Sequence, residues 1–376
     1  MRQPLPIAAI ESTVIRVPLL PRWRNDPALA GKEAVEFLIV RLRTASGHEG
    51  AGEASGTARW SGETAWGAKA LVDRVLTPQL IGADATDIDE INRLMDRVCK
   101  HNWFTKAAIE MACYDAWGRC ENRPVYDLLG GARRSLAIKN RFSLGACTPD
   151  RAAEVTAELV REGFAAFKVK VGGDPQDDIA RVRAVRVAAG PQATLTIDAT
   201  GGWSESVAID CIRRLADCNL SMVEQPTIAG DFAAMAGVRR ATMQPIIADD
   251  GCFTLIEVRE LIRNACCDAL SLYPGKNAGL RKAMAISVLA GQHGLRCTIG
   301  SNLEIDIGTA AMGHLVVAGE NMVVEEVPGD MRGPAYYDVS IAKNPMVIRG
   351  PMTLVPSGPG LGIEVDWSAV SRLAYP

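Results

Sequence analysis

The spacing of hydrophobic positions divides the chain of 376 residues into two contrasting parts. The first part begins with runs rich in Ile and Val and continues with segments that have the composition of helices. These patterns predict strands over 7–18, 35–42 and 50–56, followed by helices over 63–80, 87–99 and 105–120. Strands followed by helices predict an α+β unit over residues 1–130.

Beyond Gly130 and Gly131, short apolar runs alternate with helical segments. The runs predict strands over 139–143, 166–171, 194–198, 221–224, 246–248, 269–272, 296–299 and 322–325. Eight strands, most of them separated by helices, predict an α/β fold with a parallel (β/α) barrel over residues 131–345 rather than an open sheet. The tail over 346–376 is rich in Gly and Pro, and we expect it to leave the barrel and pack on the N-terminal unit.

Composition and charge narrow the functional classes. The formal net charge is −3 with interspersed signs, which argues against a nucleic-acid-binding surface. No apolar run reaches the length of about 18 residues that spans a membrane, and the N-terminus lacks a secretory hydrophobic segment. Ten cysteines without a CxxC pair indicate reduced thiols in a cytoplasmic protein. The four histidines are not spaced as zinc ligands.

Acidic residues stand at the carboxyl ends of three successive predicted strands. Asp198, Glu224 and Asp249 each follow an apolar run, one βα unit apart. Active sites of (β/α) barrels lie at this end of the strands. Converging carboxylates need a cation between them, and oxygen ligands without His or Cys favour Mg²⁺. An Asp at such a position could instead cap a helix, but Gln225 and Pro226 leave no helix for Glu224 to cap.

Two lysines lie one strand earlier, in the run Phe167-Lys168-Val169-Lys170-Val171. Alternation along a strand places Lys168 and Lys170 on the same face. They could be ordinary exposed lysines, but helices cover the outside of a barrel, so we expect the pair to face the barrel axis. A nearby cation and a second ammonium would lower the pKa of the amine and allow it to act as a general base. Mg²⁺ would stabilise the enediolate that forms when a proton next to a carboxylate leaves.

The Lys-x-Lys pair followed by acids at consecutive strand ends resembles the enolase superfamily. Within it, the pattern is similar to the muconate-lactonizing subgroup of the mandelate racemase/muconate lactonizing enzyme family. Segment 106–131 resembles the helix and turn that lead into the barrel in this family, and residues 307–311 fit its seventh-strand region. The likeness covers nearly the whole chain.

The resemblance implies a modified (β/α) barrel with an α+β capping domain formed by the N-terminal region and the C-terminal tail. It implies Lys170 as the principal base and Lys168 as its electrostatic partner. It also implies Asp198, Glu224 and Asp249 as the Mg²⁺ ligands.

The resemblance further implies substrate contacts from two loops of the capping domain, over 19–32 and 52–63. Candidates for these contacts, together with an acidic residue later in the chain, are Arg22, Trp23, Arg24, Trp60 and Glu304. Either arginine of the first loop could pair with a second substrate carboxylate. The simpler alternative is that both segments are surface loops.

The end of the sixth predicted strand departs from the family pattern. The family places a second catalytic lysine there, but this register falls on Tyr273, and Lys276 lies three residues later. Racemisation between two lysines is therefore less expected than one-base chemistry. Tyr273 would then act as a phenolic acid or orient the substrate, unless a local shift brings Lys276 inward.

The predicted function is Mg²⁺-dependent removal or return of a proton next to a substrate carboxylate, with muconate-type cycloisomerisation preferred. Dehydration of an acid sugar or hydroxy acid and epimerisation of an amino-acid derivative are alternatives. A metal- and carboxylate-binding protein without turnover is an alternative from another class. We expect a small-molecule carboxylate as partner, and neither nucleic acid nor a membrane. The resemblance implies a homo-oligomer.

Overall fold

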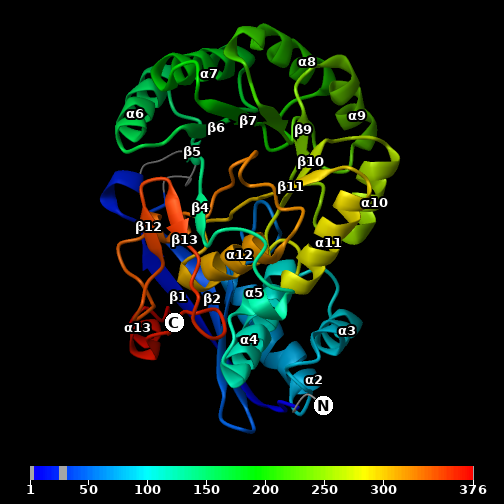
Figure 1. Ribbon diagram of the computed structural model, residues 1–376, viewed down its shortest axis with the longest axis vertical. Helices are drawn as coiled ribbons and strands as arrows, with labels where there is room; N and C mark the ends of the chain where they lie inside the picture. Colours follow the sequence, from blue (N-terminus) through cyan, green and yellow to red (C-terminus); the bar gives the residue numbers. More distant parts are fainter. Residues whose placement is uncertain (1–3, 25–31, 376) are drawn as a thin grey trace.

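The computed structural model describes residues 4–24 and 32–375, and its N-terminal strands form an antiparallel sheet (Figure 1). In spatial order these strands are β1 (Ile7–Pro18), β2 (Ala34–Thr44) and β3 (Glu49–Ala54). The strands predicted for this region are therefore confirmed. Their β-branched side chains bury one face of the sheet against the helices that follow.

The helices after this sheet are α1 (Ala65–Leu71), α2 (Thr77–Leu80), α3 (Ile88–Val98), α4 (Trp103–Glu121) and α5 (Val125–Leu128). A π-helical turn, Val72–Leu76, joins the first two. α4 is buried along most of its length and packs against β2 and β3. This close approach requires Gly52, because a Cβ atom there would lie 1.7 Å from the Ala108 carbonyl oxygen.

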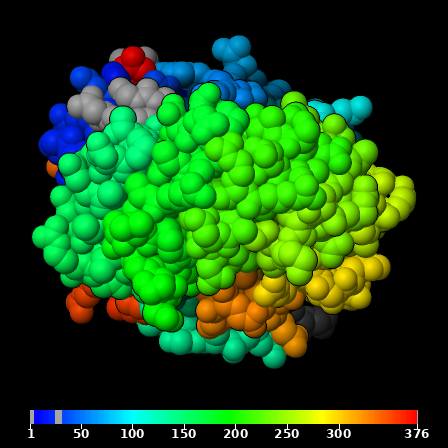
Figure 2. Space-filling model, turned by 90° about the horizontal axis from the view of Figure 1, so that it is seen from above, coloured from blue at the N-terminus to red at the C-terminus, as the bar shows by residue number. Residues whose placement is uncertain are grey.

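The second half of the molecule is a curled parallel sheet with helices on its outside (Figure 1). Figure 2 shows the outer surface of this half, where green and yellow residues cover most of the face in view. Within the described residues its seven strands, neighbours in chain order, are β5 (Phe142–Leu144), β6 (Ala166–Lys170), β7 (Thr194–Asp198), β8 (Met222–Glu224), β9 (Ile246–Ala248), β10 (Ala269–Leu272) and β11 (Arg296–Ile299). The helices are α6 (Pro149–Arg161), α7 (Pro175–Ala189), α8 (Glu205–Arg214), α9 (Phe232–Ala241), α10 (Leu255–Arg263), α11 (Leu280–Gln292) and α12 (Asp306–Ala318). This architecture confirms the predicted α/β class with a curled parallel sheet, which in the described residues forms a half-barrel of seven strands rather than the predicted eight-stranded barrel.

The strand predicted over 139–143 is wrong, because this segment divides between two sheets. β4 (Ala137–Lys139) belongs to a separate antiparallel sheet, and β5 begins only at Phe142. Asn140 causes the break: its N–H donates to the Pro351 oxygen (2.7 Å), and its side-chain amide donates to Thr353 Oγ1 (2.9 Å). The chain is thus held by the tail before it enters the parallel sheet.

The predicted eighth strand, 322–325, is also wrong. Met322 makes an isolated parallel bridge to Cys297, and the Val323 N–H donates to the Cys297 oxygen (2.8 Å). The chain then turns, because the Val327 N–H donates back to the Val323 oxygen (2.9 Å). An irregular segment therefore extends the sheet beyond β11 in place of a strand.

The C-terminal residues lie beside the N-terminal sheet. β12 (Val347–Arg349) and β13 (Met352–Leu354) pair with each other, and β13 pairs with β4, all antiparallel. The last helix, α13 (Trp367–Arg372), contacts β1. The Tyr375 N–H then donates to the Val14 oxygen (2.9 Å), so the end of the described chain is fixed to the first strand.

Two buried acids from the N-terminal region cap helices of the second half. Glu53 accepts hydrogen bonds from the N–H groups of Ile305 (2.8 Å) and Gly308 (2.7 Å) at the start of α12. Glu110 of α4 accepts one from the Leu280 N–H at the start of α11. Helix N-termini favour negative charge, but burial dominates and raises the pKa of Glu53 to about 8 and that of Glu110 to about 7.

Neither membrane spans nor disulfides are found in the described residues. No helix there is both long enough and apolar enough to cross a bilayer. All ten cysteines of the sequence fall within this part of the chain and carry free thiols, as the scattered pattern predicted.

Candidate active site

The carboxyl ends of neighbouring strands bring the predicted basic and acidic residues together. Lys170 on β6 is in register with Asp198 on β7, and Asp198 is in register with Glu224 on β8. Asp249 directly follows the last residue of β9. One edge of the sheet therefore carries these residues, and Lys168 reaches the same acids from two positions earlier on its strand.

Lys170 is the more accessible of the two lysines. Its side chain is 33% exposed, against 10% for Lys168. Lys170 Nζ lies 2.6 Å from Asp198 Oδ2 and 2.9 Å from Thr200 Oγ1. Thr200 also donates its N–H to Asp198 Oδ1 (2.9 Å), which fixes the carboxylate. The amine is thus held in place at the strand end while it still reaches solvent.

Lys168 lies between two acids. Its Nζ is 2.9 Å from Asp198 Oδ2 and 3.0 Å from Glu224 Oε1. Burial alone would favour the neutral amine, but these two carboxylates outweigh burial and raise the pKa of Lys168. This direction is opposite to the predicted lowering, because the charges nearest to Lys168 are carboxylates rather than cations.

Arg141 is a site residue that sequence reasoning missed. It stands directly before β5 with a side chain only 2% exposed, and its Nη2 donates to Glu224 Oε2 (3.0 Å). Glu224 is fully buried and therefore binds two cations, Lys168 on one oxygen and Arg141 on the other. The sequence did offer one indication of this role. Arg141 falls within a predicted barrel strand, and an unpaired charge inside a barrel is costly, so a buried acidic partner could have been expected.

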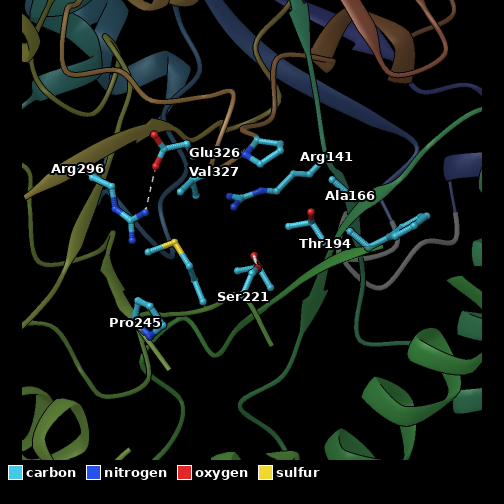
Figure 3. A pocket seen from close by; sticks show the side chains of 12 residues that line it. Arg141, Ala166, Thr194, Ser221, Pro245, Arg296, Glu326 and Val327 are labelled. Atoms are coloured by element: carbon cyan, nitrogen blue, oxygen red, sulfur yellow. Dashed lines mark hydrogen bonds and ion pairs between the residues drawn. The ribbon is translucent and has the colours of Figure 1, made fainter. Parts of the chain in front are cut away.

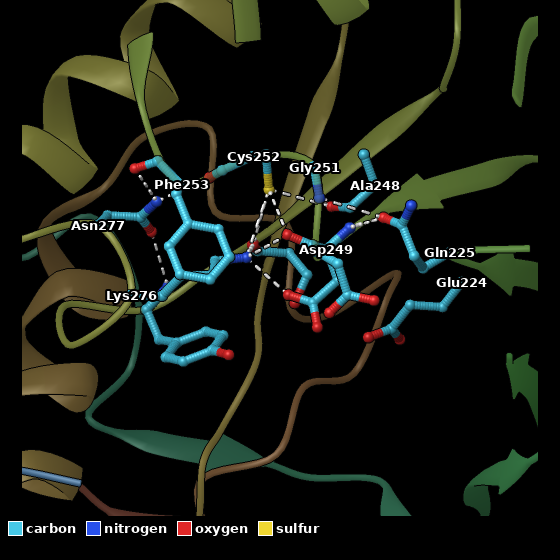
Figure 4. Close-up of polar contacts among 12 residues, drawn as sticks. Glu224, Gln225, Ala248, Asp249, Gly251, Cys252, Phe253, Lys276 and Asn277 are labelled. Carbon is cyan, nitrogen blue, oxygen red and sulfur yellow. Dashed lines mark hydrogen bonds and ion pairs between the residues drawn. The ribbon is translucent and has the colours of Figure 1, made fainter. Parts of the chain in front are cut away.

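Lys276 binds Asp249 rather than facing the lysines of β6 (Figure 4). Its Nζ lies 2.6 Å from Asp249 Oδ1, 2.9 Å from Asp249 O and 2.5 Å from Ser271 O. The side chain is fully buried. Gln225 supports the same loop, because its Oε1 accepts the Asp249 N–H (3.0 Å). The geometry makes Lys276 a positioning residue for Asp249.

The donor set at this edge has the chemistry that a hard divalent cation requires. Asp198, Glu224 and Asp249 offer only carboxylate oxygens, and the Lys168 ammonium already lies as a positive charge between two of them. In residues 4–24 and 32–375, however, no three acidic, His or Cys side chains converge closely enough to hold a metal ion. Each acid instead faces an ammonium group. Metal binding therefore requires the carboxylates to turn from these partners.

Tyr273 lies beneath an aromatic side chain from the N-terminal region. Trp60 stacks on its ring with centroids 5.9 Å apart and an interplanar angle of 15°. Burial dominates, and the charge of Asp249 adds to it, so that the pKa of Tyr273 is raised well above its usual value. The phenol is therefore held in its protonated form.

Trp60 also identifies a second site residue that sequence reasoning missed, the acid Asp250. Its indole Nε1 donates to Asp250 Oδ1. Burial first, and then the charges of Asp249 and Asp198, raise the pKa of Asp250 to about 7. Asp250 is thus an acid that changes charge near neutral pH beside the candidate lysines.

The other predicted substrate contacts lie in different surroundings. The loop composition suggested an exposed Trp23. The side chain is instead buried and packs on Phe142, with ring centroids 5.6 Å apart. Arg22 lies over the Trp23 ring (4.9 Å), and Arg24 Nε donates to the Leu19 oxygen (2.9 Å). The loop predicted over 19–32 includes residues 25–31, which lie outside the described residues.

Glu304 is buried at the start of the segment that leads into α12. It accepts hydrogen bonds from Ser301 Oγ (2.7 Å) and from the Asn302 N–H (3.0 Å). Burial raises the pKa of Glu304. The Glu304 carboxyl group therefore accepts hydrogen bonds from groups of its own loop and from Ser55 Oγ (3.5 Å).

Comparison with known proteins gives matches along nearly the whole chain. Residues 11–130 match the mandelate racemase / muconate lactonizing enzyme N-terminal domain, and residues 150–369 match the enolase C-terminal domain-like family. Muconate cycloisomerase 1 of Rhodococcus opacus is 30% identical over 370 residues, covering 97% of this chain and 98% of that protein. N-succinyl-L-Arg/Lys racemase of Bacillus cereus is 30% identical, covering 98% and 97%.

A solved structure gives the same result. The crystal structure of N-succinyl Arg/Lys racemase from Bacillus cereus superposes with a TM-score of 0.93 at 28% identity, covering 99% of each chain. The relatives are cycloisomerases, racemases and epimerases, so the chain is an enzyme of the isomerase type. These matches confirm the resemblance read from the sequence: the chain belongs to the mandelate racemase/muconate lactonizing enzyme family of the enolase superfamily.

Proposed function

We propose that the protein is a Mg²⁺-dependent enzyme that removes or returns a proton next to a substrate carboxylate, and that it cycloisomerises a muconate-type diacid. The observation that carries the proposal is the register of Lys170, Asp198 and Glu224 at three neighbouring strand ends. It sets a partly exposed amine beside acids of the type that bind a hard cation.

Each residue at this edge has a distinct proposed role. Lys170 is the general acid or base, because its amine is the accessible one of the pair. Lys168 holds Asp198 and Glu224 in position. These two acids and Asp249 would hold Mg²⁺. When bound, the cation supplies electrostatic stabilisation of the negative charge that builds on the substrate carboxylate as the α-proton leaves.

Tyr273 favours one-base chemistry. A phenol with a raised pKa can donate a hydrogen bond or a proton, but it does not accept a proton from carbon. Transfer between two basic side chains is therefore not available through Tyr273. Cycloisomerisation needs only one amine: a carboxylate adds to a carbon–carbon double bond, and Lys170 protonates the enolate carbon that results.

The N-terminal region and the C-terminal tail are proposed to cap this edge of the sheet. Trp60 supports the proposal, because it comes from the N-terminal region and contacts both Tyr273 and Asp250. Arg22 and Arg24 remain proposed partners for the second carboxylate of a diacid.

Epimerisation of an N-acylated amino acid is a second candidate reaction. The superposition with N-succinyl Arg/Lys racemase over 99% of both chains favours it. This reaction requires a proton to reach both faces of the α-carbon, whereas cycloisomerisation uses one face.

A screen of muconate-type diacids and N-acylated amino acids with Mg²⁺ in deuterated water tests both reactions. Cycloisomerisation gives a lactone that carries one deuterium, whereas epimerisation places deuterium at the α-carbon of recovered substrate. Lys170→Ala is expected to lower either activity by about 10²–10⁴-fold. Lys139→Ala, at an exposed lysine on β4, is the matched control and is expected to keep it. Equal activity of the two variants would contradict the proposal.

A further inference from the structure

A cavity of about 270 Å³ lies at the opposite end of the parallel sheet from the candidate active site (Figure 3). Its lining includes the first residues of several strands, namely Ala166 of β6, Thr194 of β7, Met222 of β8 and Arg296 of β11. Lys170, Asp198 and Glu224 stand at the other ends of the same strands. The cavity is therefore separate from the edge where the proposed chemistry occurs.

Arg141 extends into the middle of this cavity (Figure 3). Its side chain is 2% exposed, and only Nη2 has a partner, Glu224 Oε2. Nε and Nη1 make no hydrogen bond to any of the described residues. These two nitrogens carry three N–H groups. Leaving buried donors of a charged group without acceptors is costly, and an acceptor inside the cavity would offset this cost.

The charges around the cavity favour an anion. Its charged lining residues are Arg141, Arg296 and Glu326. Arg296 and Glu326 pair with each other (3.3 Å) at side-chain exposures of 38% and 63%, which places this pair at the mouth. Three cations, Arg141, Lys168 and Lys170, share two carboxylates, those of Glu224 and Asp198. The cavity side of Arg141 therefore keeps positive charge that no lining carboxylate offsets.

We propose that this cavity binds a small oxyanion, an inorganic phosphate or a small carboxylate, through Nε and Nη1 of Arg141. The hydroxyl of Thr194 also lines the cavity beside Arg141 (Figure 3). Because Arg141 also binds Glu224, a bound oxyanion completes the hydrogen bonds of the side chain that holds this acid in place. The site thus links the two ends of the sheet through one guanidinium.

Thermal unfolding of the full chain, in buffer without Mg²⁺, is the direct test. Sodium phosphate and sodium acetate are each titrated against sodium chloride at matched ionic strength, which separates the two sources of oxyanion. We expect a saturable rise in Tm of about 3 °C at hundredfold excess over Kd for the oxyanion that binds. A rise that matches sodium chloride for both anions would mean that the cavity holds only water, and would overturn the proposal.

Variants locate the binding. Arg141→Met is expected to weaken binding at least about tenfold, whereas Arg349→Met, at an exposed arginine on β12, keeps wild-type affinity. Lys170→Met is also expected to keep it. Loss of binding in Lys170→Met with retention in Arg141→Met would place the anion among the strand-end lysines, and would overturn the cavity site without affecting the proposed chemistry.

A gain-of-charge variant keeps the test decisive if Arg141→Met does not fold. Thr194→Asp places a tethered carboxylate in the cavity wall beside Arg141. It is expected to unfold at a higher temperature than wild type without added anion, and to lose the response to phosphate and acetate. A wild-type response in Thr194→Asp would overturn the proposal.

Discussion

Two buried acids of this molecule, Asp198 at the strand ends and Glu53 beside α12, have surroundings that move their pKa values in opposite directions. Burial raises the pKa of a carboxyl group in both regions. At the strand ends, the ammonium groups of Lys168 and Lys170 outweigh burial and lower the pKa of Asp198. Between the N-terminal region and α12, Glu53 accepts hydrogen bonds from two backbone N–H groups, which do not offset its burial. The charges of Glu304 and Asp306 add to the effect of burial, and the pKa of Glu53 rises to about 8.

The difference separates acids that are arranged for chemistry from acids that hold the fold. A carboxylate that keeps its charge beside movable ammonium groups can exchange them for a metal ion or a substrate. A carboxyl group that caps a helix has partners fixed by the backbone, so it has nothing to exchange. Burial alone would not distinguish the two groups.

Glu224→Gln is expected to have the largest effect on this comparison. The amide leaves the buried Arg141 guanidinium without its carboxylate partner and removes one of the two acids, Glu224 and Asp198, that pair with Lys168. Breaking such a pair costs about 3–5 kcal/mol in the free energy of unfolding, and activity should fall below detection. Denaturant unfolding and turnover measure the two effects.

The control for Glu224→Gln is Glu325→Gln. Glu325 also pairs with an arginine, Arg134 (3.1 Å), but its side chain is 61% exposed. Exposed pairs contribute about 0–1 kcal/mol. Equal free energies of unfolding for the two variants would show that the Glu224 charge contributes no more to stability than an exposed surface charge, and would contradict the prediction.

Mg²⁺ should stabilise the protein through the strand-end acids only. At hundredfold excess over Kd, a bound ion raises the free energy of unfolding by about 2.7 kcal/mol. Asp249→Asn should lose most of this gain, because it removes one proposed ligand, whereas Asp338→Asn at an exposed position should keep it. Thermal unfolding with and without a chelator measures the shift, and an unresponsive wild type would contradict the metal proposal.

The sequence predicted the regular part of the molecule well because repeated patterns encode it. β1 and the positions of Asp198 and Glu224 at strand ends follow from alternation and apolar runs. The irregular segment that replaces the predicted eighth strand after Met322 was not predictable, because it depends on a turn within an apolar run.

The partners of the site residues depended on contacts between distant segments. Arg141 and Glu224 are 83 positions apart in the sequence, and Glu53 and Ile305 are 252 apart. No local pattern reports such pairs. The burial of Trp23 was missed for the same reason, since its partner Phe142 belongs to another part of the chain.

Glu53→Gln should change how stability depends on pH. The folded protein holds the Glu53 proton up to about pH 8, whereas the unfolded chain loses it near the ordinary glutamate pKa of 4.5. The stability that protonation contributes is therefore fully present below pH 4.5 and is lost as the pH rises to about 8. Glutamine mimics the protonated acid, so the variant should lack this loss, which amounts to about 1.4 kcal/mol per pH unit within this window.

The control for Glu53→Gln is Glu49→Gln, on the same strand but paired with Arg41 at the surface. Denaturant unfolding at pH 5, 6.5 and 8 measures the slope in each variant. If Glu53→Gln and wild type lose stability in parallel over this range, Glu53 is charged throughout and the contrast with Asp198 disappears.

Tyr273→Phe should have the smallest effect. The ring that stacks on Trp60 is retained, and no hydrogen bond to the phenol hydroxyl is present among the described residues, so stability should change by less than about 1 kcal/mol. In one-base chemistry the hydroxyl only orients the substrate, and kcat should fall by at most about tenfold.

Trp60→Phe controls for a disturbed ring stack. A loss of activity as large as that of Lys170→Ala would contradict this role and make the phenol an essential acid. The Tyr273 hydroxyl could then supply a proton that Lys170 does not, because its raised pKa keeps it protonated.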